Sequence, residues 1–181
     1  MTARPDLSQL PYGLSTRPVD PRRGLPIPAV NAYPDGEVDF ISINGAKAME
    51  LAVRGRCGLC GLPMSGRAAF LGGPKAAEAG LYSDPPMHEA CAEAALTLCP
   101  HIARPHARRA SERRREHDAT HAVGFSDEKP SEWVLLVCDG YGSAFAPAVD
   151  GGVVPIFVAG EVLHARRFGY QEGVLAEIAE K

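Results

Sequence analysis

Two short motifs near the middle of the chain combine the residue types and the spacing of a metal site. Cys57 and Cys60 form a C-x2-C pair, and His88 and Cys91 form an H-x2-C pair after 27 intervening residues. Thiolate sulfur and imidazole nitrogen are ligands that tetrahedral Zn²⁺ prefers, and four protein ligands leave no coordination position for a substrate. We therefore expect these four residues to bind a structural Zn²⁺ ion.

The residues around the two motifs predict how the four ligands converge. A glycine follows each cysteine of the first pair and allows the backbone to turn tightly around the metal. The sequence Asp84-Pro85-Pro86 is typical of a helix start, with an acidic cap followed by proline, so we expect a helix from there to Leu98. On such a helix His88 and Cys91, three residues apart, would lie on one face.

Local patterns predict the remaining elements. Asn44 can cap a helix over residues 45–54, and the apolar runs at residues 133–138 and 153–158 predict buried strands. The apolar face of that helix is expected to contain Ala46, Met49, Ala52 and Val53. Shorter strands are expected at residues 38–43, 67–72, 80–83 and 161–167, turns at residues 72–75 and 139–142, and a terminal helix at residues 172–180.

Composition indicates a folded protein with many turns. Hydrophobic residues make up 45% of the 181 residues, which is enough for a packed core. The prolines concentrate at the start of the chain, where we expect an extended arm whose residues 24–30 lie on the core. We divide the chain into a Pro-rich arm (1–36), a zinc-binding core (37–103), an Arg-rich polar helix (104–121) and a β-rich segment with a terminal helix (122–181).

Charge is distributed unevenly along the chain. The formal net charge of −3 is not typical of a nucleic-acid-binding protein, but the segment from residue 104 to residue 118 is positively charged. This segment can contact phosphates, form internal ion pairs with Glu112 and Glu116, or contact an acidic protein, and the sequence leaves all three open. The candidate nucleic-acid-binding residues are Arg104, Arg108, Arg109, Arg113, Arg114 and Arg115.

Other features of the sequence predict the cellular location of the protein and the state of its remaining cysteines. The first residues lack the pattern of a signal peptide and the apolar runs are too short to span a bilayer, so we expect a cytoplasmic protein without a membrane partner. In the cytoplasm, cysteines are more typically metal ligands or free thiols than disulfide partners. We expect Cys99 and Cys138 to be buried thiols. No small-molecule cofactor motif is evident. His164, with Arg166 and Arg167, offers a small anion site.

The order of a C-x2-C turn, two short strands and a helix that donates two ligands resembles the treble-clef zinc finger over residues 56–99. That resemblance implies a hairpin between turn and helix, and a function in nucleic-acid binding, protein binding or, in HNH nucleases, catalysis. The nucleases also use an asparagine, and here Asn31 and Asn44, the only asparagines, both precede the turn. This departure argues against a nuclease.

A second resemblance covers about two thirds of the chain. The layout is similar to small proteins of actinobacteria and their phages, and it implies a family without a particular activity. The shared stretches are Arg23–Pro28, Cys57–Gly61, Gly72–Pro74, Asp84–Ala92 and Cys99-Pro100.

The expected fold is α+β, with a treble-clef-like zinc core, a small mostly antiparallel sheet and a Pro-rich N-terminal arm. The leading interpretation of function is a non-enzymatic, zinc-stabilised binding or adaptor protein. It would contact nucleic acid or a nucleic-acid-bound protein such as a recombinase or a transcription regulator, as a phage-type regulator does. One alternative is a zinc-dependent hydrolase or deaminase with Glu89 as general base. The other is a protein-only interaction or inhibitor module.

Overall fold

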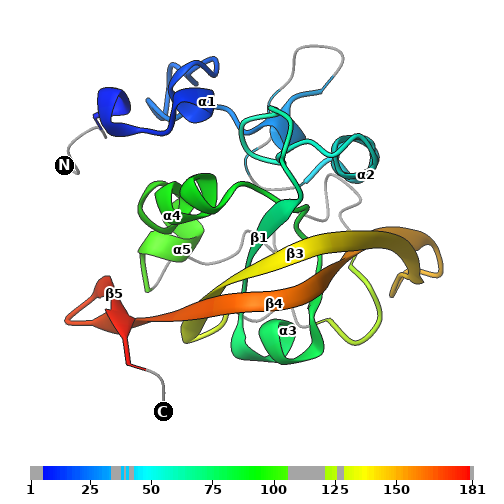
Figure 1. The fold of residues 1–181 in the computed structure, drawn as a ribbon. Helices are drawn as coiled ribbons and strands as arrows, with labels where there is room; N and C mark the ends of the chain where they lie inside the picture. Colours follow the sequence, from blue (N-terminus) through cyan, green and yellow to red (C-terminus); the bar gives the residue numbers. More distant parts are fainter. Residues whose placement is uncertain are drawn as a thin grey trace.

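The computed structural model describes residues 6–33, 38, 40, 43–105, 121–125 and 129–179. Its centre is a five-stranded antiparallel sheet that curls into a half-barrel (Figure 1). Along the sheet the strand order is β1-β3-β4-β2, and β5 pairs with β4. The α+β class and the antiparallel sheet are therefore confirmed. The strands are β1 (Arg67–Gly72), β2 (Leu81–Tyr82), β3 (Glu132–Pro147), β4 (Val153–Gln171) and β5 (Val174–Ile178).

Strands β3 and β4 form one long hairpin that crosses the molecule as a curved ribbon (Figure 1). The two strands predicted at residues 153–158 and 161–167 are parts of the single strand β4. The turn predicted at residues 139–142 is wrong, because these residues continue β3. The register shifts between Val137 and Cys138, and Gly140 has a φ of 70°. The glycines thus accommodate an irregularity in a continuous strand rather than a chain reversal.

The C-terminal helix predicted at residues 172–180 is also wrong. Glu172 and Gly173 both have positive φ, 50° and 83°, and form a tight turn that returns the chain as β5 along β4. Two consecutive residues with positive φ are typical of the turns that join antiparallel strands. The hydrogen bonds with β4 therefore determine the structure of this segment, although its sequence has a weak helical pattern.

The helical elements are short. Asn44 caps α2 as predicted, since its side-chain oxygen accepts a hydrogen bond from the Lys47 backbone N–H at 3.1 Å. The predicted apolar face is only partly right, because Ala48, Leu51 and Ala52 are buried whereas Val53 is 72% exposed. The elements are η1 (Leu7–Gln9), α1 (Tyr12–Ser15), η2 (Ala29–Asn31), α2 (Gly45–Val53), α3 (Pro74–Ala79), α4 (Glu89–Leu98) and α5 (Pro100–Ala103).

The segment between β1 and β2 differs from the expectation of a treble clef. A helix, α3, stands where a turn was predicted at residues 72–75, because Pro74 takes its first position. Strand β1 pairs with β3, and β2 pairs with β4, so β1 and β2 are not the two strands of a hairpin. The treble-clef arrangement is therefore not shown by the structure.

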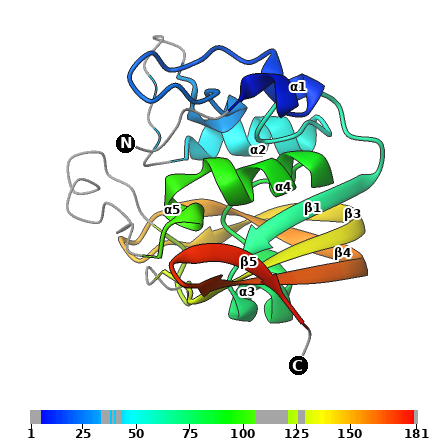
Figure 2. The same ribbon diagram turned by 90° about the vertical axis from the view of Figure 1, so that its left-hand side faces the viewer.

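Both faces of the sheet centre are covered. Ala69 and Leu71 of β1 belong to an apolar cluster with α4, whereas Ala68 and Phe70 belong to a second cluster with α2. Figure 1 shows α4 and α5 on one side of β1 and α2 on the other, and Figure 2 shows α1, α2 and α4 as successive layers above the strands. Because both faces of β1 and of the first half of β3 pack against a cluster, these strands are apolar at successive positions rather than at every second position.

The N-terminal arm packs on the core in the way predicted for residues 24–30, since Ala29 and Val30 are 5% and 3% exposed. It contains the helical turns η1, α1 and η2, so it is less extended than expected. In the segment predicted as strand 38–43, Val38 forms a bridge with Ala32. The predicted Arg-rich polar helix at residues 104–121 falls almost entirely outside the described residues, which omit 106–120. In the described part of the chain, no helix has the length and hydropathy to cross a membrane.

Candidate metal centre

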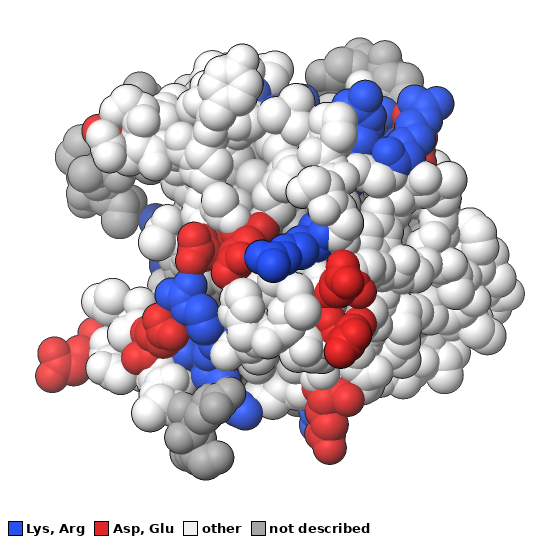
Figure 3. All heavy atoms as spheres, viewed as in Figure 1, with Lys and Arg blue, Asp and Glu red and all other residues white. Residues whose placement is uncertain are grey.

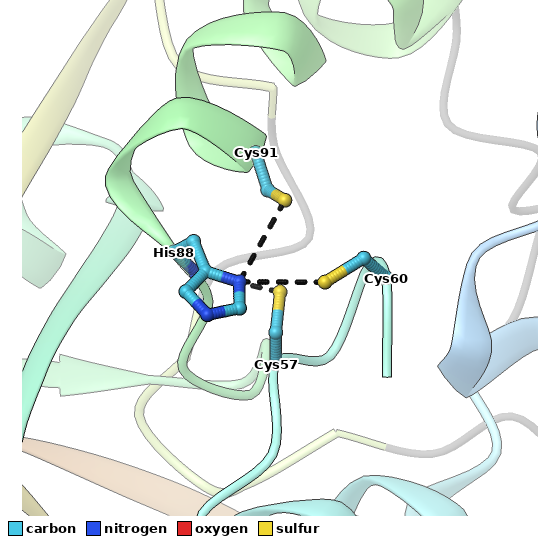
Figure 4. A group of neighbouring side chains, drawn as sticks. All are labelled: Cys57, Cys60, His88 and Cys91. Carbon is cyan, nitrogen blue, oxygen red and sulfur yellow. Dashed lines mark hydrogen bonds between the residues drawn. The ribbon is translucent and has the colours of Figure 1, made fainter. Parts of the chain in front are cut away.

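The four residues of the two motifs meet in one place. One potential ligand atom from each of Cys57, Cys60, His88 and Cys91 lies within 4.8 Å of the others, and Figure 4 shows the three sulfur atoms facing the same ring nitrogen of His88. The cysteines are 0%, 5% and 2% exposed, so the group is enclosed by protein. Three thiols and an imidazole at this separation are compatible with a bound metal ion, and such a ligand set is typical of Zn²⁺.

The first pair sits on a tight turn whose backbone is directed at the sulfur atoms. The N–H of His88 donates to the Cys57 thiol at 3.4 Å, and the backbone amides of Cys60 and Leu62 act to lower the pKa of the Cys57 and Cys60 thiols, respectively. The N–H of Gly61, which has a φ of 77°, bonds to the Cys57 carbonyl at 2.8 Å. We call residues 57–62 the knuckle. Its amides stabilise the thiolate forms that a metal requires.

Gly58 is required by the close approach of a neighbouring segment. A Cβ atom at this position would lie 2.5 Å from Cγ of Pro85. The N–H of Gly58 also donates to the Pro86 carbonyl at 2.9 Å. The knuckle and the segment before α4 are thus in direct backbone contact.

The second pair is positioned by that segment and not by a helix starting at Asp84. The Met87 backbone exchanges two hydrogen bonds with Ala69 of β1, at 2.8 and 3.0 Å, which holds this segment extended. Consecutive prolines favour the same extended conformation in the residue before each of them. The predicted helix therefore begins at Glu89, with His88 as its N-cap and Cys91 in its first turn.

The ring of His88 is oriented by hydrogen bonds on both sides. Its Nδ1 atom lies 3.3 Å from Sγ of Cys60 and 3.9 Å from Sγ of Cys91. Its Nε2 atom lies 3.0 Å from the carbonyl oxygen of Pro63, which can only accept, so Nε2 carries the proton and donates. The Nδ1 lone pair is then directed at the sulfur atoms, as a metal ligand requires.

In the metal-free group the three thiols share protons unequally. Hydrogen bonds from the Cys60 and Cys91 thiols lower the pKa of Cys57 to about 2. Donation to Cys57 in turn raises the pKa of Cys60 and of Cys91. Since a metal requires all three as thiolates, binding has to displace the protons of Cys60 and Cys91.

Two further cysteines lie outside this group, as predicted. Cys138 is fully buried in the second apolar cluster, and its thiol donates to the Gly140 carbonyl at 3.2 Å. Cys99 ends α4 and packs against the first cluster, and burial raises the pKa of its thiol. Cys138 is therefore a buried core thiol as expected, whereas Cys99 is only partly buried, and neither belongs to the candidate ligand group.

The candidate general base and the candidate anion site are both engaged elsewhere. The Glu89 carboxylate lies 2.9 Å from Nε2 of His164 on β4. Arg166 forms ion pairs with Glu93 and Glu177, and Arg167 pairs with Glu132. Figure 3 shows positive and negative side chains lying next to one another over α4, β4 and β5. These groups connect α4 to the sheet, so the structure gives no support for an anion site at residues 164–167.

Of the six candidate nucleic-acid-binding residues, Arg104 lies just after α5. The other five, Arg108, Arg109, Arg113, Arg114 and Arg115, fall outside the described residues.

The N-terminal arm also contributes to the centre, which the two motifs do not indicate. A Cβ atom at Gly13 would lie 2.9 Å from both Cβ and Sγ of Cys60, so α1 is packed directly on the knuckle. The backbone of Ala29 and Val30 bonds to the Leu59 and Gly58 carbonyls, at 2.8 and 3.1 Å. No local pattern in the first thirty residues indicates these contacts, because the partners are far away in the sequence.

Comparisons of the chain with protein-family models, with curated proteins and with solved structures find no match. The assignment of the centre therefore rests on its ligands and their geometry.

Replacing Cys60 by Ala should remove one ligand and abolish stoichiometric Zn²⁺ binding. Because structural metal binding is coupled to folding, the free energy of unfolding should fall by about 3 kcal/mol or more. Metal analysis and thermal unfolding measure the two effects. Cys99→Ser, which changes a thiol outside the group, should keep the metal, and equal metal content in both variants would contradict the site.

Loading the centre with Zn²⁺ near neutral pH should release about two protons, those held by Cys60 and Cys91. Affinity should therefore fall as the pH is lowered, since protons compete with the metal for the thiolates. Titration calorimetry in buffers of different ionisation enthalpy counts the protons. A binding enthalpy that does not depend on the buffer would contradict the proposed protonation of the metal-free group.

Proposed function

We propose that the protein is a non-enzymatic binding protein whose fold is stabilised by Zn²⁺. The observation that carries the proposal is the enclosed Cys57–Cys60–His88–Cys91 group, which supplies four protein ligands from two separate segments. Four protein ligands complete a tetrahedral shell, whereas a catalytic zinc keeps one position for water or substrate. Zn²⁺ at this place would therefore hold segments together rather than activate a substrate.

The position of Glu89 supports the same conclusion. A zinc hydrolase or deaminase needs a general base that can reach a metal-bound water. Here the nearest candidate in sequence, Glu89, is hydrogen-bonded to His164 on the exposed side of α4, with its side chain 40% exposed. No specific contact in the described part of the chain favours the enzymatic alternative over the binding protein.

X-ray absorption of the zinc-loaded protein should show three sulfur ligands and one nitrogen ligand, with no additional oxygen. This follows from the closed ligand set, because a fifth ligand would have to displace one of the four. Substitution by Co²⁺ provides a second measurement, since a tetrahedral thiolate site gives intense visible absorption. An oxygen ligand in the absorption data would contradict the non-enzymatic proposal and favour a hydrolytic centre.

We further propose that the Arg-rich segment at residues 104–117 contacts the phosphates of nucleic acid, or of nucleic acid in complex with a protein. In the described residues Lys and Arg nearly balance Asp and Glu, and the arginines at 166 and 167 are paired with carboxylates. This segment therefore carries an excess of positive over negative side chains that the described residues do not have. Contacts to phosphates by arginine depend on charge and not on base sequence.

Replacing Arg108, Arg109, Arg113 and Arg114 by Ala should weaken binding to duplex DNA about tenfold or more and reduce the salt dependence of the affinity. Fluorescence anisotropy at two salt concentrations measures both. Arg22 and Lys75 are exposed cations outside the segment, so replacing both by Ala is a control that should change affinity about twofold at most.

The absence of salt-dependent binding in the unaltered protein would exclude nucleic acid as the partner and leave the protein-only interaction module as the remaining binding function. An affinity that the four substitutions do not change would instead exclude the Arg-rich segment as the surface that contacts nucleic acid.

A further inference from the structure

One face of the β3–β4 hairpin is covered by α2 along part of its length and is open beyond it. In the covered part, the Tyr141 hydroxyl donates to the Ala52 carbonyl of α2 at 2.7 Å. Phe145 follows Tyr141 by four residues in β3 and points to the same face, because side chains alternate along a strand. Phe145 is nevertheless 63% exposed. The closed end of the hairpin therefore presents an aromatic ring to solvent.

This ring belongs to the same surface as the first turn of α2. The residue opposite Phe145 in the antiparallel register is Pro155 of β4. A Cβ atom at Gly45, where α2 begins, would lie 3.3 Å from Cγ and from Cδ of Pro155. Figure 1 shows the closed end of the hairpin beside α2. A ligand that contacts the ring would therefore meet the outer side of the helix.

The outer side of α2 is positively charged. Glu50 is paired with Lys47 at 3.0 Å and with Arg54 at 2.9 Å, and Arg56 follows the helix. The hydrogen bond from Lys47 lowers the pKa of Glu50, and the charges of Arg54 and Arg56 lower it further. Three cations thus lie around one carboxylate and leave an excess of two positive charges. Figure 3 shows Lys and Arg side chains gathered over α2.

These cations are accessible to a ligand. The side chains of Lys47 and Arg54 are 36% and 66% exposed, and Arg56 is exposed although it donates to the Gly61 carbonyl at 2.9 Å. Exposed ion pairs contribute little to stability, so a phosphate can replace Glu50 as their partner at small cost. The carboxylate of Asp150, in the hairpin turn, already accepts a hydrogen bond from the Gly152 N–H at 3.0 Å.

Cations next to an exposed aromatic ring match the chemistry of single-stranded nucleic acid. The cations bind backbone phosphates, and the ring stacks on a base whose face is free. In a duplex, neighbouring bases cover these faces, so a duplex would use the cations and leave the ring without a partner. An acidic protein segment would likewise satisfy the charges without requiring the ring.

We propose that Lys47, Arg54, Arg56 and Phe145 form a surface that binds single-stranded nucleic acid, with the cations on phosphates and the ring on a base. We call it the α2–Phe145 surface. The proposal rests on the nucleic-acid function proposed above, and it adds a second contact surface and a class of ligand. Because the surface contains no residue of the Arg-rich segment, the two can be tested separately.

Substitutions at Phe145 test the stacking contact. Phe145→Ala should bind a labelled oligothymidine of about 16 nucleotides about tenfold more weakly than the unaltered protein, as fluorescence anisotropy measures. Phe145→Leu, which keeps an apolar side chain without a ring, should be as weak, and Phe145→Trp should bind within about twofold of the unaltered protein. Val174→Ala, at a 67% exposed apolar position on β5, is the matched control and should leave the affinity unchanged.

Substitutions on α2 test the charge in both directions. Glu50→Gln removes the only carboxylate of the pairs and should strengthen binding several-fold. The double variant Lys47→Ala with Arg54→Ala should weaken binding about tenfold and reduce the slope of log affinity against log salt by about one. Thermal unfolding verifies that each variant is folded. The Arg22 and Lys75 double variant described above is the control for loss of two cations elsewhere. The same measurements with oligouridine distinguish RNA from DNA as the source of the strand.

Three results would overturn the α2–Phe145 surface and leave the proposed function intact. The first is binding of oligothymidine that neither the Phe145 nor the Glu50 variants change. The second is a duplex affinity equal to the single-strand affinity. The third is weakening by the charge variants alone, since this would mean phosphate binding without stacking. If the unaltered protein binds neither oligothymidine nor duplex DNA, then the nucleic-acid function itself is contradicted, so the two failures are distinguishable.

Discussion

Three thiols and one imidazole enclosed within 4.8 Å of one another are the constraint on which the rest of the structure depends. Such a group cannot carry three thiolates without a cation, because like charges in a poorly solvated space repel strongly. Accordingly, hydrogen bonds from the Cys60 and Cys91 thiols lower the pKa of Cys57, whereas the pKa values of Cys60 and Cys91 are raised. A bound divalent metal removes this conflict and converts a repulsive cluster into a cross-link.

The candidate ligands lie within the main core rather than in a separate finger. The three cysteines share an apolar cluster with Trp133, Leu135 and Val137 of β3. The segment before α4 adds to the edge of β1 through the Met87–Ala69 bridge, and β1 pairs with β3. A change at the metal is thereby coupled to the central hairpin. A treble clef would instead close its own hairpin between the ligand pairs, and here β1 and β2 pair with β3 and β4.

Charged side chains also hold helix α4 to the sheet. Glu89 and Glu93 stand one helical turn apart and pair with His164 and Arg166 of β4. Exposed pairs of this kind each contribute about 0–1 kcal/mol, so their main effect is orientation rather than stability. Because Cys91 is in the first turn of the same helix, the pairs and the metal constrain the same end of α4.

Sequence reasoning succeeded where the signal is local and failed where the partner is distant. The spacing of the two motifs and the cap at Asn44 depend on a few neighbouring residues, and the structure brings these residues together as expected. The start of α4 was misplaced because hydrogen bonds to Ala69, eighteen residues earlier, keep Met87 extended. The C-terminal strand was missed for a similar reason, since β5 is determined by an available edge of β4. The close approach of Gly13 to Cys60 leaves no pattern in the sequence at all.

The residues at both ends of the Arg-rich segment are anchored to the same core. Arg104 directly follows α5, and the Ile102 carbonyl of α5 accepts a 2.6 Å hydrogen bond from the Tyr170 hydroxyl. Tyr170 in turn accepts a bond from Nε1 of Trp133 at 3.1 Å, and the Lys129 ammonium donates to the Arg104 carbonyl. At the other end Ala122 forms a bridge with Ala148, which is 4% exposed.

Both ends of the Arg-rich segment are thus fixed to the β3–β4 hairpin, and the first end follows α4 and α5 in the chain. Fixed ends reduce the conformational entropy that a binding segment loses on contact with its partner. A metal that holds α4 in place would therefore also hold the point from which the Arg-rich segment continues.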